Sequence, residues 1–362
     1  MIAPLAKFID WSALQVAAML PSFRKCARGD SKLTEAVGFL NGPDFIPAES
    51  KPAEPEFKSN IHFTFPSPRP CELAENNIVH GRLYRRAKDW QKFPTIILLH
   101  GGGDFLSQRF GFPLMVPAIH RAGFNAATLA APYHCQRRVH RIEAFDHLRV
   151  AEAFAQGVAE IRALTGWLLN QGCPSIALFG FSLGGWLAGL AATRDNRLKA
   201  VILALPGVRR DYRATRGECV LWTPMRKALE KQKAAREALD KTPMNLTLRQ
   251  PVIPKENILL IQGRYDLLVE AEQTEELWQK WKQPEIWRLP HGHISWMGAP
   301  GLTGRVLHWL SPRLNAPAVQ ARPQATLPDN AESEKRKMGD SFDLQGNQPI
   351  DSALFRTRQN IP

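Results

Sequence analysis

Apolar residues follow two different periodicities along the chain, and the change from one to the other separates an N-terminal part from the rest of the sequence. In 61–65 and 79–83, apolar and polar positions alternate, which predicts two half-buried strands around the proline-rich turn 66–70. Further on, short runs are almost entirely apolar, as is typical of parallel strands that are covered on both faces. These runs are 95–99, 125–129, 176–179, 200–204 and 258–261.

The intervals between the apolar runs predict how the strands are connected. Helical stretches such as 148–171 favour right-handed crossovers, so we predict an α/β fold, with a doubly wound, mostly parallel sheet that starts with antiparallel strands. This domain is expected over 59–311, after an N-terminal helical extension at 1–58. Residues 207–254 interrupt the alternation and predict either a cap-like insertion over the strand ends or a solvated crossover helix. The Pro-, Ala- and Gln-rich segment 312–362 predicts a disordered tail.

The first twenty residues are rich in apolar side chains but are interrupted by polar ones. Asp10 and Gln15 break the apolar run and no clear small-residue cleavage site follows, so a helix is favoured over a signal peptide. Lys7, Asp10 and Gln15 would share a narrow polar face of that helix. Docking onto the protein's own body is the favoured interpretation, and lying in a membrane interface is the alternative.

Charge and cysteine content narrow the classes of partner. The formal net charge of +13 favours anionic partners, yet no basic stripe interleaved with aromatics indicates nucleic acid. An anionic small molecule, a lipid-like ester or peripheral contact with an anionic membrane fits the charge equally well. The five cysteines are scattered without a C-x-x-C pair, which predicts a cytoplasmic protein with neither disulfides nor a zinc site.

A Gly-x-Ser-x-Gly motif stands between a predicted strand and a predicted helix. The apolar run 176–179 leads into Gly180, Ser182 and Gly184, and a helix-compatible run follows at 186–192. This strand-turn-helix context is typical of the nucleophile elbow of serine hydrolases. The two glycines allow the sharp bend that holds the serine in a strained conformation with its hydroxyl exposed. A small Gly-Ser turn without chemistry is the alternative.

A nucleophilic serine needs a base, and the base needs an acid that orients it. Asp266 follows the strand 258–261, and His293 follows a short predicted strand at 285–289, so both stand in the chain order expected after Ser182. His291 is the second candidate for the base. A helix N-cap role for Asp266 and a polar loop role for the histidines are the alternatives.

An oxyanion hole is expected from two backbone N–H groups. One belongs to Leu183, directly after the serine, and the other to the glycine run after strand 95–99, with Gly102 favoured over Gly103. A phosphate-binding loop is the competing interpretation, but neither G-x-G-x-x-G nor a Walker lysine follows. The apparatus requires no cofactor and no metal.

These motifs give the chain from about residue 60 to residue 310 a resemblance to the α/β-hydrolase superfamily. That resemblance implies the fold and a Ser182, Asp266 and His293 triad. More narrowly, the sequence resembles the abhydrolase-domain 18-type proteins, although His291 occupies a position more often held by glycine. The residues that carry this narrower resemblance are 101–104, Arg109, 131–134, Arg137 and Arg138.

Basic residues near the predicted strand ends suggest the substrate. Arginine binds carboxylate or phosphate through two parallel hydrogen bonds, so these residues favour an anionic group on the substrate. The alternative is that they are solvated or paired with acids such as Glu143, Asp146 and Asp211. The predicted substrate-binding residues are Arg109, Tyr133, Arg137 and Arg138, with Arg141, Arg209, Arg210, Arg213 and Arg216 as further basic candidates.

The sequence therefore predicts a serine hydrolase that cleaves a carboxylic ester, anionic or lipid-like, through an acyl-enzyme. An acyltransferase that uses the same triad is one alternative. A non-catalytic protein of the same fold, which binds anionic ligands or membranes, is the other.

Overall fold

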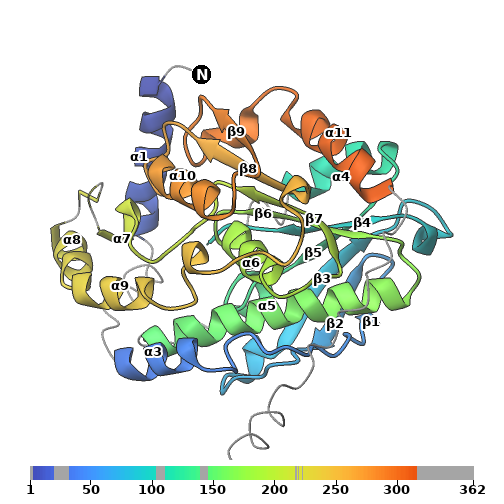
Figure 1. Ribbon diagram of the computed structural model, residues 1–362, viewed down its shortest axis with the longest axis horizontal. Coiled ribbons are helices and arrows are strands. Elements are labelled where there is room, and N and C mark those ends of the chain that lie inside the picture. The colour runs from blue at the N-terminus through green and yellow to red at the C-terminus, as the bar shows by residue number, and fades with distance from the viewer. Residues whose placement is uncertain are drawn as a thin grey trace, which may run out of the picture. The chain divides into compact units, whose positions relative to one another are not determined.

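The computed structural model describes residues 3–19, 32–102, 111–138, 146–216, 218, 220–221 and 223–315. Within them, nine strands form one sheet in the order β1-β2-β3-β5-β4-β6-β7-β8-β9 (Figure 1). The strands are β1 (Glu56–Phe57), β2 (His62–Pro66), β3 (Ile78–Tyr84), β4 (Thr95–Leu99), β5 (Asn125–Leu129), β6 (Ile176–Phe181), β7 (Leu198–Ala204), β8 (Ile258–Gly263) and β9 (Glu285–Leu289).

The sheet changes from antiparallel to parallel where the sequence changes from alternating apolar and polar positions to continuous apolar runs. β1, β2 and β3 pair antiparallel, and β3 pairs antiparallel with β5, as in the register Gly81↔Leu129. All pairs from β5 to β9 are parallel. The predicted α/β fold class, with its mostly parallel sheet and antiparallel start, is confirmed.

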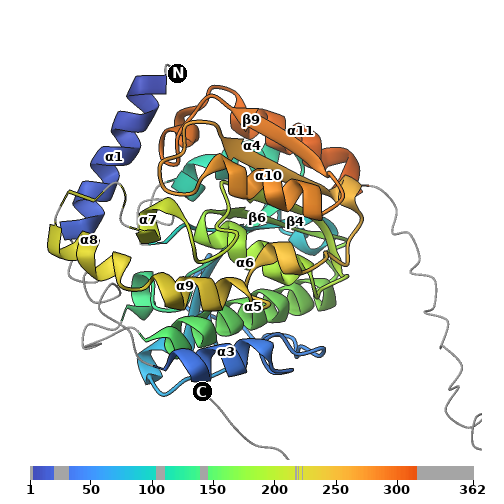
Figure 2. The same cartoon turned by 60° about the vertical axis from the view of Figure 1, so that its left-hand side comes forward.

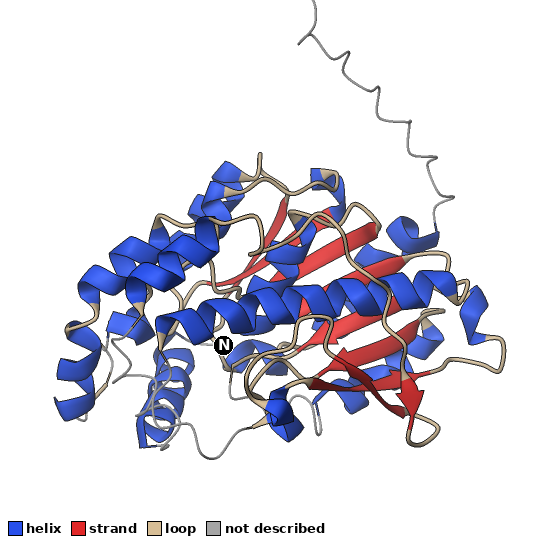
Figure 3. Ribbon diagram, turned by 90° about the horizontal axis from the view of Figure 1, so that it is seen from below, coloured by secondary structure: helices blue, strands red, loops and turns tan. Residues whose placement is uncertain are grey.

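Helices cover both faces of the sheet. On one face lie α3 (Leu33–Asn41), α5 (His147–Asn170), α6 (Leu183–Ala192) and α10 (Ala271–Lys280), and on the other lie α4 (Phe112–Arg121) and α11 (Leu302–Asn315). Figure 3 shows the long helix α5 crossing the front of the sheet. The last helix extends past the predicted domain boundary at residue 311, and the predicted tail from residue 316 onward lies outside the described residues.

Successive residues of the central strands enter opposite cores, which explains the uninterrupted apolar runs. In β4, Ile97 and Leu99 pack into the core beneath α5 and α6, whereas Ile96 and Leu98 pack into the core beneath α4 and α11. Because a strand exposes successive side chains to opposite faces, a sheet covered on both faces buries every position and favours apolar residues there. The buried polar exceptions on β4 and β5 are Thr95, Asn125 and Thr128.

The first helix, α1 (Ala3–Met19), lies beside the loop after β9, which contains the 3-10 turn Ser295–Gly298 (Figure 2). One face of α1 is buried through Ala6, Asp10 and Leu14. The opposite face exposes four large apolar side chains, Leu5, Phe8, Trp11 and Val16. No described helix combines the length and the apolar character needed to cross a bilayer.

The segment between β7 and β8 contains more than one crossover helix. It includes α7 (Arg213–Arg216), α8 (Thr223–Glu230) and α9 (Lys233–Asp240), which gather on the side of the molecule where α1 lies (Figures 1 and 2). The segment is tied to α6 by a 2.8 Å hydrogen bond from the Trp186 indole N–H to the Met244 carbonyl. It therefore packs against the helix that begins directly after Ser182.

Candidate active site

Ser182 occupies a strained turn between β6 and α6. Its φ of 53° and ψ of −113° lie outside the regions that residues with a side chain favour. Its backbone is held on both sides, because its N–H donates to the Ala204 carbonyl and its carbonyl accepts from the Gly207 N–H. The side chain precedes the first turn of α6, where the positive end of the helix lies.

Close backbone contacts explain the glycines of the motif. A Cβ on Gly180 would lie 2.2 Å from the Gly184 carbonyl oxygen, and a Cβ on Gly184 would lie 2.3 Å from the Leu99 carbonyl oxygen. Neither position can carry a side chain unless the backbone shifts. The sharp bend at Ser182 therefore depends on both glycines.

The structure brings Ser182, His293 and Asp266 into one hydrogen-bonded line. His293 Nε2 lies 2.9 Å from Ser182 Oγ, and His293 Nδ1 lies 2.7 Å from Asp266 Oδ2. Since an ionised carboxylate can only accept, Nδ1 carries the proton and Nε2 is left to accept from the serine hydroxyl. This arrangement allows His293 to remove the hydroxyl proton of Ser182.

Asp266 is fixed by its own loop. Its Oδ1 accepts hydrogen bonds of 2.8 and 2.9 Å from the backbone N–H groups of Leu268 and Val269. The other carboxylate oxygen faces the imidazole. The loop therefore orients the carboxylate before any substrate binds.

The electrostatics of His293 favour its protonated form. Burial alone lowers the pKa of this histidine, but the charge of Asp266, its hydrogen bond to Nδ1 and the charge of Asp10 outweigh burial. The pKa of His293 is therefore raised above the usual value for histidine. The other candidate base, His291, is also buried, and burial lowers its pKa. Its backbone carbonyl accepts from the Tyr265 N–H, whereas the ring bonded to Ser182 and Asp266 is that of His293.

The glycine loop after β4 adjoins the start of α6. A Cβ added to Gly102 would lie 4.0 Å from the Leu183 Cβ, so the two expected oxyanion donors come from neighbouring segments. The buried His100 stabilises this loop: its Nδ1 bonds the Gly101 carbonyl and its Nε2 accepts from the Ala131 N–H. Burial lowers the pKa of His100 to about 4, which keeps the ring neutral and suits this pair of bonds. Gly103 lies outside the described residues.

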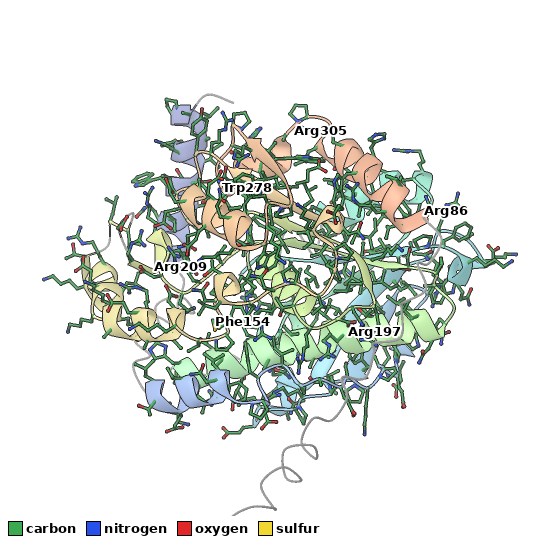
Figure 4. The ribbon with its side chains drawn as sticks, in the orientation of Figure 1. Arg86, Phe154, Arg197, Arg209, Trp278 and Arg305 are labelled. Carbon is green, nitrogen blue, oxygen red and sulfur yellow. The ribbon has the colours of Figure 1, made fainter. Side chains whose placement is uncertain are left out.

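A cavity of about 160 Å³ opens beside Leu183. Its walls are mostly apolar, with Phe154 of α5, labelled in Figure 4, among them. The Phe154 ring packs edge-on against Trp186, with the ring centroids 4.7 Å apart. Tyr133 and Arg210 add polar groups to the lining, so the predicted Tyr133 lies in the same cavity as Leu183.

Arg137 does not reach this cavity, which corrects the prediction that it binds substrate. The side chain is completely buried, and its guanidinium bonds both carboxylate oxygens of Glu160 and the carbonyls of Ala130 and Asn76. The neighbouring Arg138 is exposed. Arg109 and Arg141 lie outside the described residues.

Most of the arginines after β7 are paired with acids. Arg209, labelled in Figure 4, pairs with Glu276 and Asp240, and Arg216 pairs with Glu270. Arg213 pairs with Glu218 at 3.3 Å. The alternative that these side chains form ion pairs within the protein therefore fits them better than substrate binding.

Asp10 is the residue near the site that the sequence did not identify. It was expected only on the polar face of the N-terminal helix, yet its carboxylate accepts backbone hydrogen bonds from the loops that carry Asp266 and His293. The available signal was the one acidic residue of a mostly apolar helix. As for metal ligands, the described part of the chain holds no group of three His, Cys, Asp or Glu side chains placed to bind an ion.

Comparison with known proteins gives one family match and several structural matches. Residues 42–208 match the family described as alpha/beta hydrolase domain containing 18. The Mycobacterium tuberculosis proteins Rv2627c and MT2702 are each 34% identical over 144 residues, which make up 38% of this chain. The match spans 33% of each relative's own length.

Two esterases of known structure share the fold. The Pyrococcus furiosus esterase Pf2001 superposes with a TM-score of 0.51 at 16% identity, covering 72% of this chain and 92% of that chain. Acetyl xylan esterase 1 from Thermoanaerobacterium sp. superposes with a TM-score of 0.50 at 14% identity, covering 82% of this chain and 99% of that chain. At these identities, the likeness concerns the fold alone.

Proposed function

We propose that this chain is a serine hydrolase of the α/β-hydrolase superfamily and that it cleaves carboxylic esters; the family match over residues 42–208 and the shared fold support this. The observation that carries the proposal is the hydrogen-bonded line from Ser182 through His293 to Asp266. The strained backbone of Ser182 adds support, since strain of this kind is found where a residue is held for function.

The proposed reaction proceeds through an acyl-enzyme. His293 Nε2 takes the proton of Ser182 as Oγ attacks the ester carbonyl carbon, and the N–H groups of Leu183 and of Gly102 or Gly103 stabilise the oxyanion. The tetrahedral intermediate collapses when His293 donates that proton to the leaving alcohol. A water molecule, deprotonated by His293, then attacks the acyl carbon, which releases the acid and restores Ser182. Asp266 stabilises the imidazolium in both halves of the reaction.

The proposed substrate is an ester with a short apolar acyl group. An engineered apolar cavity of about 150 Å³ binds benzene, so the cavity beside Leu183 suits a group of about six carbon atoms. Arg210, in the same lining, favours an anionic group on the substrate. Tyr133 and the exposed Arg138 remain candidates for binding it.

Peripheral contact with a lipid surface belongs to the same proposal. The outward face of α1 exposes Leu5, Phe8, Trp11 and Val16, the side chains that interfacial helices bury among lipid headgroups. The net charge of +13 favours an anionic surface. A lipid-like ester is therefore the second substrate class.

Turnover of p-nitrophenyl esters tests the proposal. We expect release of p-nitrophenol from butyrate or hexanoate esters by the wild type and none above background by Ser182→Ala. Acyl-enzyme formation without release into water, with transfer to an added alcohol, would favour the acyltransferase. If the folded wild type forms no acyl-enzyme, both catalytic hypotheses are contradicted and the non-catalytic binding protein is favoured.

A further inference from the structure

Asp10 is a buried carboxylate on a helix that precedes the catalytic domain in the chain. Its side chain is 0% exposed, in the middle of the 17-residue helix α1. A buried carboxylate is costly unless hydrogen-bond donors compensate for the loss of water. The donors that Asp10 uses therefore indicate what this helix does.

Among the described residues, the three donors to Asp10 are backbone N–H groups beside Asp266 and His293. Leu267 N–H donates to Oδ2 at 3.1 Å, directly after Asp266. His293 N–H donates to Oδ2 at 2.6 Å, and Ile294 N–H donates to Oδ1 at 2.9 Å. One carboxylate thus bonds the loop after β8 and the loop after β9 at the same time.

Gly292 shows how closely the two loops and the helix fit. A Cβ at this position would lie 2.5 Å from Asp10 Oδ2 and 2.7 Å from its Cγ. The missing side chain at residue 292 lets the carboxylate approach the backbone on the N-terminal side of His293. The contact between the Asp10 carboxylate and the loop therefore needs two residue types, an acid at residue 10 and a glycine at residue 292.

We propose that Asp10 is a positioning residue for the reaction, holding the loops of Asp266 and His293 in register and placing a second negative charge behind the imidazole. This inference rests on the serine-hydrolase function proposed above. Hydrogen bonds to a carboxylate are stronger than those between neutral groups, which suits Asp10 to fixing two loops. Catalytic geometry tolerates displacements of only about half an ångström, so a clamp on both loops affects the rate.

The charges around the imidazole come from separate elements. Asp266 faces His293 from the loop after β8 and Asp10 faces it from α1, while Ser182 approaches from the elbow and His291 lies on the same loop. Burial lowers the pKa of His293, and both carboxylates raise it. The pKa of Asp10 itself is raised by burial and by the charge of Asp266, although its backbone donors favour the ionised form.

The test compares the wild type with Asp10→Asn, which is nearly isosteric but uncharged. Two quantities are measured as functions of pH: the rate of labelling of Ser182 by a fluorophosphonate probe, and the NMR titration of the His293 Cε1–Hε1 signal. We expect labelling to fall on the order of tenfold. Because the variant lacks one of the two charges that raise the pKa of His293, its titration and the acid limb of labelling should both move to lower pH.

Gln15→Ala is the matched control on the same helix. Gln15 accepts a 3.0 Å hydrogen bond from the Leu221 N–H, and its side-chain amide donates to the Trp11 carbonyl within the same helix. Its labelling rate should stay within about twofold of the wild type, with the His293 titration unchanged. An equal effect of both variants would assign the role to helix docking in general and overturn the proposal.

The NMR titration separates this inference from the proposed function. A wild type that is not labelled, with a His293 titration that still moves in Asp10→Asn, would contradict the hydrolase but keep the positioning role. If Asp10→Asn shows the same His293 titration and the same labelling profile as the wild type, the positioning role is overturned. If Asp10→Asn does not fold, Asp10→Ser replaces it, and failure of both to fold would assign Asp10 to stability and also overturn the proposal.

Discussion

The guanidinium of Arg137 donates hydrogen bonds of 2.6 and 2.7 Å to the two carboxylate oxygens of Glu160, and both side chains are buried. The pair joins the segment after β5 to the middle of α5. Ser67 adds a 2.7 Å hydrogen bond to the same carboxylate. An arginine that the sequence suggested for substrate binding is thus part of the internal structure.

Arg137→Met should lower the free energy of unfolding by about 3–5 kcal/mol, because it leaves the Glu160 carboxylate buried without its partner. Urea denaturation followed by circular dichroism measures the change. The exposed neighbour provides the control, and Arg138→Met should change stability by no more than about 0.5 kcal/mol. Unchanged stability of Arg137→Met would contradict the assignment of a structural role.

Gly184→Ala should destabilise the protein on the order of 3 kcal/mol, since the new Cβ would overlap the Leu99 carbonyl oxygen. Probe labelling of Ser182 should fall as well, because the turn that holds the serine must open. Urea denaturation measures the first effect and intact mass the second.

The control for this change is Gly38→Ala in the exposed part of α3. Nothing lies within 4 Å of a Cβ at that position, and alanine favours the helix, so stability should rise by about 0.5–1 kcal/mol. If Gly184→Ala were as stable as Gly38→Ala, the close contact at the elbow would not be as described.

Asp266→Asn should reduce the labelling rate about a thousandfold or more, because the amide no longer holds the imidazole in the reactive tautomer. The wild-type rate should increase with pH through the pKa of His293, which lies above the ordinary 6.5, since only the neutral ring accepts the serine proton. Without the Asp266 charge that pKa falls, so the acid limb moves to lower pH. An acid limb that stays in place would contradict the pairing of Asp266 with His293.

Ala153→Phe should restrict the accepted substrates to esters with shorter acyl chains, since Ala153 lines the cavity beside Leu183 and a phenyl ring would fill part of it. The ratio of kcat/KM for a hexanoate ester to kcat/KM for an acetate ester should be about tenfold lower, or more, in the variant than in the wild type. The acetate ester serves as the internal control for folding and for the reactivity of Ser182. If this ratio is the same in the variant and the wild type, the acyl group does not bind in the cavity beside Leu183.

The sheet was predictable from the sequence because its strands are covered on both faces. Every residue of β4 and of β5 is buried, so the apolar runs stand out against the amphipathic helices around them. The antiparallel start was predictable for the opposite reason: β3 buries alternate residues such as Val79 and Leu83.

The proximity of Ser182, Asp266 and His293 could be predicted because chain order and strand ends imply it. Residues after parallel strands meet at one edge of the sheet, so local motifs were sufficient. The sequence favoured His293 over His291 but left both open, and the ring that bonds Ser182 and Asp266 is that of His293.

Contacts between distant segments could not be predicted from the sequence. Asp10 bonds to residues more than 250 positions away, and no local pattern identifies its partners. Arg137 and Glu160 are likewise brought together by the packing of α5. A charged residue has the same appearance in a sequence whether it is solvated, paired or directed at a substrate.

The measurement that tests the central claim most directly is labelling by a fluorophosphonate probe, followed by intact mass, on the wild type, Ser182→Ala and His293→Ala. An activated serine requires one probe per wild-type chain, none on Ser182→Ala and very little on His293→Ala. A folded wild type that takes no probe, or a Ser182→Ala variant labelled as fast as the wild type, would contradict the assignment of Ser182 as the nucleophile.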